Sequence, residues 1–315
     1  MAAKLIDIAL IGVGPMASQH ARAIAAVAGL RITSCASRNR DRAEEFAAQN
    51  GIPRARTLQE AIANPEADAL WLCVAADAMA EAACSFAPLG LPMFLEKPVG
   101  LDVSETNAVR DRIAVLHMIG LNRRFYEVIC RGRDLVAAAG GPRTIEIHMP
   151  EDVAAAPSKH SPRTRAQWQF ANSVHLIDLF RFFGGEPADV VTMNEVRSES
   201  DRSYNALIRF GNGTRGIYHS QWFAPGGWRL ALYADDLSIV YQPIETAEVR
   251  RRGGPPAALC AEGPDARFKA GLWAQAEAFR DMVATGRMPQ GAADLAEYAR
   301  SVALVERLTE VKTVG

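Results

Sequence analysis

The sequence predicts an α/β fold, in which a doubly wound parallel sheet is followed by an α+β domain built on an open, mostly antiparallel sheet. Three observations lead to this fold class. Short apolar runs alternate with alanine-rich, helix-like segments over about the first 120 residues, which is typical of parallel sheets with right-handed crossovers. A glycine-rich turn follows the first apolar run. Beyond that region, strand-like runs follow one another without intervening helices, which indicates antiparallel pairing.

The elements of the first domain can be placed from their apolar pattern. Strands are expected at residues 6–11, 31–36, 69–75, 93–95 and 116–121. Helices are expected at residues 17–28 and 40–50, and an alanine-rich helix is expected between the third and fourth strands. Gly51 closes the second helix, because glycine readily takes the left-handed conformation that ends helices.

The second half of the chain shows the antiparallel pattern. Strands are expected at residues 144–149, 190–196, 204–210, 215–220 and 229–233, and terminal helices at 268–285 and 292–311. The turn Gly211-Asn212-Gly213 is a strong hairpin signal, since these residues tolerate positive φ. Two loops are expected, at residues 150–165 and 251–264, and the first is either a lid or a solvated loop. We predict domains at residues 1–121 and 122–315, with the last helix able to pack back on the first domain.

Composition excludes several classes of protein. The 315 residues are 49% hydrophobic and 23% charged, unlike a disordered or coiled-coil chain. With 35 basic and 36 acidic residues, the net charge of −1 provides no field for a nucleic acid or an anionic membrane. The apolar runs are shorter than a bilayer span, and the N-terminus lacks a signal-peptide pattern. The five cysteines and six histidines show no metal-binding spacing, so we expect free thiols in the cytoplasm and no metal.

The glycine-rich turn, Gly-Val-Gly-Pro-Met-Ala, matches the pattern Gly-x-Gly-x-x-Gly/Ala. Gly12 permits a tight turn, Gly14 lets the backbone approach a pyrophosphate, and Ala17 lets the helix pack closely on the strand. Pro15 and Met16 begin that helix, whose exposed N–H groups and dipole attract phosphates. Because the motif follows a strand and opens a helix, it predicts dinucleotide binding. The alternative is a glycine turn that serves packing only.

The end of the second strand predicts which dinucleotide is bound. We call the glycine-rich turn and helix start at residues 12–17 the cradle. An NAD site places an acidic residue about 20 positions beyond this cradle, where it accepts hydrogen bonds from the ribose. Here Ser37 and Arg38 stand at that position, and Arg42 follows. A hydroxyl and arginines bind a 2′-phosphate, whereas a carboxylate repels it. We therefore predict NADP as the cofactor in preference to NAD. The alternative is that these arginines only solvate a helix start.

Glu96-Lys97-Pro98 ends a parallel strand, so Lys97 is expected in the crevice where ligands of open sheets bind. A lysine there can neutralise a developing alkoxide, donate a proton or hold a ribose hydroxyl. At this point the chain resembles the glucose–fructose oxidoreductase / inositol dehydrogenase / MocA (Gfo/Idh/MocA) family over nearly its whole length. The resemblance is carried by the glycine-rich turn with His20 after it, Ser37-Arg38, Glu96-Lys97-Pro98, Gly120 to Phe125, and His175 to Asp178.

The resemblance implies an N-terminal Rossmann domain and a C-terminal sheet whose free face builds a homodimer or homotetramer. It also implies NAD(P)-dependent oxidation or reduction of sugars, polyols and related alcohols. Lys97, often before a cis proline peptide, is then expected to contact substrate and nicotinamide ribose, with Glu96 and Ala75 beside the cofactor. Positions Asn122 and Arg124 are expected to bind substrate.

The segment around His175 reads as a helix. Asn172 or Ser173 is a suitable N-cap, and glycines at 184 and 185 end the helix. In the first turn, the helix dipole disfavours the charged imidazole, and a neutral His175 suits a general base. Asp178 shares its face and is expected to orient it, while Asn172 is expected to contact substrate. The alternative is a packed histidine with a solvated aspartate.

Two departures from the family pattern leave other functions open. Relatives often carry an aspartate four residues before this histidine, where this chain has Ala171, and a histidine where it has Met79. We expect an NADP-dependent oxidoreductase acting on a hydroxyl or carbonyl of a sugar-like molecule. The alternatives are a catalytically inactive nucleotide-binding sensor or regulator, and an enzyme that uses tightly bound NAD(P) transiently in elimination or glycosidic cleavage.

Overall fold

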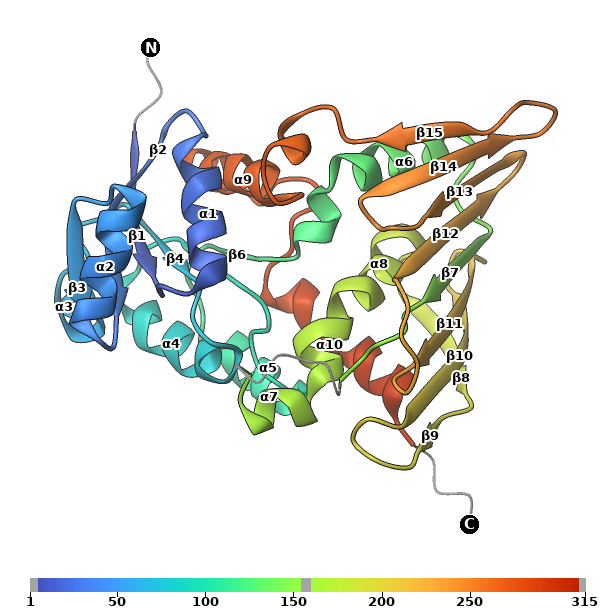
Figure 1. Cartoon of the computed structure of the whole chain (residues 1–315), viewed down its shortest axis with the longest axis horizontal. Coiled ribbons are helices and arrows are strands. Elements are labelled where there is room, and N and C mark those ends of the chain that lie inside the picture. The colour runs from blue at the N-terminus through green and yellow to red at the C-terminus, as the bar shows by residue number, and fades with distance from the viewer. Residues whose placement is uncertain (1–4, 154–159, 312–315) are drawn as a thin grey trace. The chain divides into compact units, whose positions relative to one another are not determined.

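The structure, a computed structural model, describes residues 5–153 and 160–311 (Figure 1). The chain forms two compact units. The first unit comprises Met1–Phe125 and Pro264–Ala299, and the second comprises Tyr126–Gly263 and Arg300–Gly315. The segment Pro264–Ala299 thus joins the first unit, whereas the boundary expected from the sequence assigned it to the second domain.

The first unit contains a six-stranded parallel sheet in the order β3-β2-β1-β4-β5-β6. Its strands are β1 (Ile6–Ile11), β2 (Leu30–Ser37), β3 (Arg54–Thr57), β4 (Ala69–Leu72), β5 (Met93–Leu95) and β6 (His117–Ile119). Its helices are α1 (Pro15–Ala25), α2 (Arg40–Asn50), α3 (Leu58–Ala63), α4 (Met79–Phe86), α5 (Val103–Arg110) and α9 (Leu272–Thr285). The strand order reverses between β1 and β4, which is where ligands bind in doubly wound sheets.

Apolar burial accounts for these strands and for the place of α9. All four residues of β4 are buried, as expected for a parallel strand covered on both faces. Trp71 of β4 stacks on Phe94 of β5 with ring centroids 3.8 Å apart, and Phe279 of α9 meets Trp71 edge-on at 5.1 Å. Helix α9 is therefore part of the first unit's core. Its own sequence pattern does not predict this tertiary contact.

The second unit is built on a nine-stranded mixed sheet in the order β15-β14-β13-β12-β7-β11-β10-β8, with β9 paired to β10. Among the strands of this sheet that the structure describes, only β7 and β11 pair in parallel. Its strands are β7 (Thr144–His148), β8 (Pro187–Thr192), β9 (Glu195–Val196), β10 (Arg202–Phe210), β11 (Arg215–Gln221), β12 (Arg229–Ala234), β13 (Leu237–Tyr241), β14 (Thr246–Arg251) and β15 (Ala257–Cys260). The expectation of a loop over residues 251–264 is wrong in part, because β15 lies within it and pairs with β14.

Helices cover one face of this sheet. They are α6 (Glu127–Ala138) and α8 (Val174–Gly184), while α7 (Pro162–Ala166) precedes α8 in the chain and α10 (Leu295–Thr309) begins in the first unit and ends in the second. Helix α8 packs on β7 and β11, and α6 packs on β12 (Figure 1). Strand β11 alternates buried and exposed side chains, which is the pattern of a sheet with one open face.

The five cysteines are free thiols, and burial raises the pKa of the Cys35 thiol to about 11. Among residues 5–153 and 160–311, no three His, Cys, Asp or Glu side chains gather where they could hold a metal ion. Within the same ranges, no helix is long and apolar enough to cross a membrane. The loop expected at residues 150–165, either a lid or a solvated loop, falls partly at 154–159, outside the described residues, and α7 occupies part of the remainder.

Candidate functional site

The backbone conformation and close packing at the first glycine of the cradle, Gly12, require glycine. Its φ is +110°, and a Cβ placed there would lie 2.1 Å from the carbonyl oxygen of Cys73, just after β4. Its N–H donates to the carbonyl of Ala36 at 2.8 Å. Only glycine tolerates this φ and this approach, so the turn closes tightly against the carboxyl ends of β2 and β4.

The second glycine, Gly14, has no such explanation within the protein. Its φ of −87° and ψ of 177° suit any residue, and a Cβ there would meet no protein atom within 4 Å. Gly14 is the N-cap of α1, and no side chain caps this helix, whose first residue is the exposed Pro15. Ala17 is fully buried, so the helix packs closely on the sheet. An uncapped helix start beside an open glycine fits a pyrophosphate.

The carboxyl end of β2 presents two cationic side chains. Arg38 and Arg42 are exposed, and neither guanidinium group forms a hydrogen bond or ion pair with any residue that the structure describes. The backbone N–H of Arg42 donates to Asn39 Oδ1 at 3.0 Å. Arg40 is engaged instead, since it donates to the carbonyl of Ala55 at 3.3 Å and pairs with Glu60. The Ser37 hydroxyl accepts a hydrogen bond from the Asn39 N–H at 3.3 Å, which leaves its own proton for another acceptor. Arg38 and Arg42 are thus the arginines here that can meet a phosphate.

The Glu-Lys-Pro motif places its two charged side chains differently. The Lys97-Pro98 peptide is cis, as the resemblance implies, and Lys97 is half-buried at the carboxyl end of β5. Glu96 is 8% exposed, and its Oε2 accepts a hydrogen bond from Nε2–H of the fully buried His20 on α1 at 3.1 Å. The Glu96 side chain therefore connects α1, the helix that follows the cradle, to the loop that carries Lys97. Sequence reasoning assigned Glu96 to the cofactor and missed this partner.

The end of β4 completes this edge of the sheet. Ala75 is exposed and lies three residues after the end of β4, which stands between β1 and β5 in the strand order. Burial raises the pKa of the Cys73 thiol well above its ordinary value, and the Glu96 charge raises this pKa further, so Cys73 is no nucleophile. Met79 is 1% exposed and belongs to the core.

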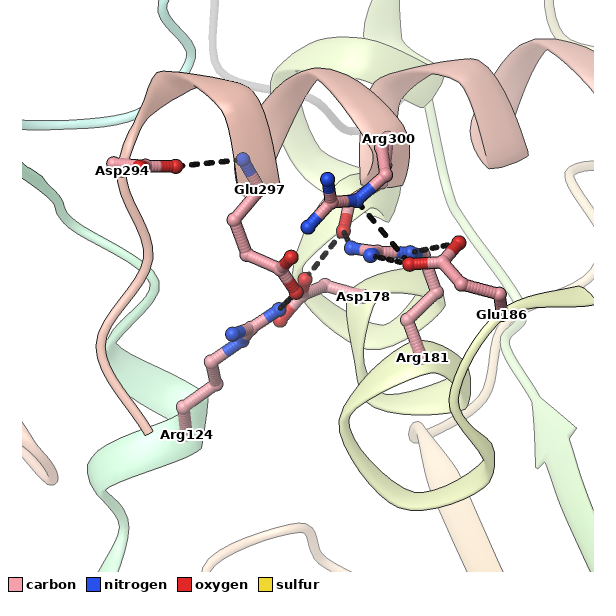
Figure 2. Close-up of polar contacts among 8 residues, drawn as sticks. Arg124, Asp178, Arg181, Glu186, Asp294, Glu297 and Arg300 are labelled. Carbon is pink, nitrogen blue, oxygen red and sulfur yellow. Dashed lines mark hydrogen bonds and ion pairs between the residues drawn. The ribbon is translucent and has the colours of Figure 1, made fainter. Parts of the chain in front are cut away.

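Asn122 and Arg124, expected to bind substrate, are both buried in the first unit and make contacts there. The Asn122 side-chain amide donates to the carbonyl of Ala270 at 3.1 Å. The Arg124 guanidinium, 4% exposed, donates to Glu297 of α10 at 3.2 Å (Figure 2). These contacts fix where the two side chains lie. Their predicted role toward substrate stays a prediction.

The helix that carries His175 does not begin as the sequence suggested. Ser173 has helical dihedrals and makes no capping hydrogen bond. Instead, a π-helical turn, Gln169–Ser173, leads directly into α8. The predicted N-cap at residue 172 or 173 is therefore wrong, and His175 does not lie in a first helical turn. The helix dipole therefore gives no reason to expect a neutral His175 imidazole, because the effect of the dipole fades beyond the first turn.

Asp178 lies one turn after His175 and is 1% exposed. Its Oδ1 accepts a hydrogen bond from the Ser301 hydroxyl at 2.6 Å, and Arg181 donates to the same Ser301 oxygen at 2.9 Å. Figure 2 shows Arg181 and Arg300 converging on the carboxylate of Glu186. Asp178 is thus held by a network that links α8 to the middle of α10. Sequence patterns gave no signal for Ser301, which is 123 residues away from Asp178.

Sequence reasoning also missed Glu151. This residue follows β7, is 6% exposed, and accepts hydrogen bonds from three side chains of the segment that precedes α8. A lone acidic residue in a predicted loop carries no local signal of burial. Asn172, expected to bind substrate, is one of its three donors.

Known proteins share this architecture. A family model described as "Oxidoreductase family, NAD-binding Rossmann fold" matches residues 6–119, and "GFO/IDH/MocA C-terminal domain" matches residues 133–240. Inositol 2-dehydrogenase of Rhizobium meliloti (strain 1021) is 30% identical over 191 residues, which are 58% of this chain and 56% of that protein. The chain thus spans about half the length of the curated relatives it matches.

Solved structures show the same fold over almost the entire chain. UDP-N-acetylglucosamine 3-dehydrogenase GnnA from Acidithiobacillus ferrooxidans has a TM-score of 0.75 at 23% identity, with 96% of each chain covered. Levoglucosan dehydrogenase in complex with NADH and levoglucosan has a TM-score of 0.80 at 19% identity, again with 96% of each covered. Fold, cradle, lysine loop and both family matches agree: the chain belongs to the Gfo/Idh/MocA oxidoreductase family, with an NAD-binding Rossmann domain followed by the family's C-terminal domain.

Proposed function

We propose that this chain is a cytoplasmic oxidoreductase that uses NADP to oxidise or reduce a hydroxyl or carbonyl carbon of a sugar, polyol or similar small molecule. The observation that carries the proposal is the cradle. Gly12 is explained by packing, whereas Gly14 faces open space at the uncapped start of α1. The named activities of the relatives, on inositol and on levoglucosan, support the sugar-like substrate class.

Each site residue has a distinct role in the proposed reaction. Gly14, Met16 and Ala17 hold the pyrophosphate through the start of α1, and Ala75 and Glu96 border the cofactor. When bound, the nicotinamide ring supplies or accepts the hydride. Lys97 stabilises the charge that develops on the substrate oxygen, since a positioned cation acts most strongly in a partly dry site. His175, oriented by Asp178, takes or returns the hydroxyl proton. Asn122, Arg124 and Asn172 orient the substrate.

A substrate panel tests the proposal. The purified chain is incubated with NADP⁺ and with myo-inositol, levoglucosan and common aldoses, and reduced nicotinamide is followed by absorbance at 340 nm. Turnover of at least one of these alcohols is expected, with the His175→Ala variant as the inactive control. Tight nucleotide binding without turnover in either direction on alcohols and keto-sugars would instead favour a sensor.

The preference for NADP follows from the end of β2. Two exposed arginines, whose guanidinium groups have no partner among the described residues, and a serine in place of a carboxylate suit a 2′-phosphate. Removing one of these arginines tests the preference. Arg38→Ala is expected to weaken NADPH binding by about tenfold, or 1.4 kcal/mol, and to leave NADH binding almost unchanged. The measurement is a fluorescence titration of both nucleotides.

Arg22→Ala is the matched control, because Arg22 is also an exposed arginine of the first unit but lies on α1. It is expected to leave both dissociation constants unchanged. An equal loss of NADPH and NADH affinity in Arg38→Ala contradicts a 2′-phosphate contact at this residue.

The open face of the second sheet supports a homodimer or homotetramer. Val191 of β8, Leu207 of β10 and Ile217 of β11 lie opposite one another in register and form one exposed apolar row. Val191 is 67% exposed and Leu207 is 62% exposed. A contiguous apolar row on a flat sheet suits an isologous contact with a second copy of the chain.

A substitution in this row tests the contact. Leu207→Lys places a charge at the centre of the row and is expected to raise the dissociation constant of the oligomer by about tenfold or more. Light scattering after size exclusion measures the mass across a dilution series. Met288→Lys is the control, since Met288 is an exposed apolar residue of the first unit. An unchanged mass for Leu207→Lys excludes this face as the interface.

A further inference from the structure

We propose that Glu151 is a positioning residue for His175, because its carboxylate holds the π-helical turn from which the helix of His175 continues. The proposal rests on the proposed function in one respect, since His175 matters to catalysis only if the chain is an oxidoreductase. The contacts that support it lie entirely within the second unit.

The carboxylate of Glu151 is buried and fully engaged by donors from one short segment. Its Oε1 accepts hydrogen bonds from the Asn172 amide at 3.0 Å and from the Ser173 hydroxyl at 3.1 Å. Its Oε2 accepts from the indole N–H of Trp168 at 3.1 Å and from the same Asn172 amide at 3.1 Å. A carboxylate is costly to bury unless donors surround it, so these contacts order both the acid and the segment.

The π turn explains why three donors reach one carboxylate. The N–H of Val174 bonds to the carbonyl of Gln169, five residues back, which widens the turn. In a regular α-helix, Ser173 points about 100° away from Asn172. The wider turn returns Ser173 to the side on which Trp168 and Asn172 lie. The π turn and the Glu151 contacts therefore depend on one another, and π turns are frequent at functional sites.

Glu151 is itself anchored to the sheet. Its N–H donates to the carbonyl of Gln221, the last residue of β11, at 3.0 Å. The start of α8 is thus tied to the sheet through one side chain. His175 follows Ser173 by two residues and is 6% exposed. The π turn leads directly into α8, so the position of Ser173 fixes the path of the backbone to His175 two residues later. Glu151 therefore sets the orientation in which His175 is presented.

The experiment compares Glu151→Gln with Glu248→Gln, which makes the same change at a half-exposed carboxylate of β14 in the same unit. The full chain is labelled in histidine, and the His175 ring signals are assigned with His175→Gln. The amide of Glu151→Gln brings an N–H₂ group against donors, so we expect the His175 signals to shift or broaden. The signals of His20 and His117, in the first unit, are expected to stay in place, and Glu248→Gln is expected to change none of these signals.

A kinetic measurement separates positioning from general structure. With NADP⁺ and myo-inositol, Glu151→Gln is expected to lower kcat by about 10- to 100-fold, since small misplacements of reacting groups cost this much. KM and the NADPH dissociation constant are expected to stay close to those of the wild type.

An unchanged His175 signal in Glu151→Gln overturns the proposal, whatever the kinetics. If Glu151→Gln does not fold, Ser173→Ala removes one donor and keeps the carboxylate, and the same comparison of His175 signals decides. If the wild type oxidises no polyol, the proposed function fails, while the spectroscopic comparison still tests the role of Glu151.

Discussion

Lys97→Met is expected to lower kcat by about 10²–10³-fold while NADPH binding remains largely intact. In the proposed function, the substitution removes the cation that stabilises charge on the substrate oxygen, and losing one such preorganised donor has this effect in other enzymes. The proposed pyrophosphate site uses backbone groups at the start of α1, which Lys97 does not supply. The measurement is kcat and KM with NADP⁺ and the best substrate of the panel, beside a fluorescence titration with NADPH.

Lys269→Met is the matched control for this prediction. Lys269 is an exposed lysine of the first unit. Its loss is expected to leave kcat at the wild-type level. Equal turnover in Lys97→Met and the wild type removes Lys97 from the chemistry and leaves it with a structural role in the loop.

Gly14→Val is expected to weaken NADPH binding by about 100-fold, or 2.7 kcal/mol, without lowering the melting temperature. The backbone at Gly14 suits valine, and a Cβ there meets no protein atom within 4 Å. The added side chain would stand where the pyrophosphate must approach the start of α1. Thermal unfolding and NADPH titration of the same preparation measure both effects.

Gly12→Ala is the contrasting variant at the same turn. With φ at +110° and a Cβ 2.1 Å from the Cys73 oxygen, alanine here is expected to destabilise the first unit by about 3 kcal/mol or more. The substitution at Gly14 is thus expected to change nucleotide affinity, whereas the substitution at Gly12 is expected to change stability. Wild-type NADPH affinity in Gly14→Val contradicts the placement of phosphate at this cradle.

Elements with strong local patterns could be predicted from the sequence. The bounds expected for β1, β5 and α2 match the structure, because each is an apolar run or a capped helix with Gly51 at its end. Strand β3, Arg54–Thr57, was not expected, since it is polar and its residues are at most half-buried. It pairs only with β2 at the sheet edge, where burial does not impose an apolar pattern.

The candidate site was predictable where a motif carries its chemistry in adjacent residues, as in the cradle and Glu96-Lys97-Pro98. It was not predictable where a residue acts through tertiary contacts. Glu151 reaches Trp168 and Asn172 only because the chain folds back after β7 and because a π turn, which has no reliable sequence signature, brings the donors together. The failed N-cap prediction at residue 173 has the same cause.

The proposed function depends on a pyridine dinucleotide with a 2′-phosphate bound at the carboxyl edge of the first sheet. Its most direct test is a titration of the wild-type chain with NADPH and with NADH, followed by nicotinamide fluorescence. We expect saturable binding of NADPH at micromolar concentration or below, and weaker binding of NADH by about tenfold or more. Tighter binding of NADH would contradict the cofactor preference, and a chain that binds neither nucleotide would contradict the account as a whole.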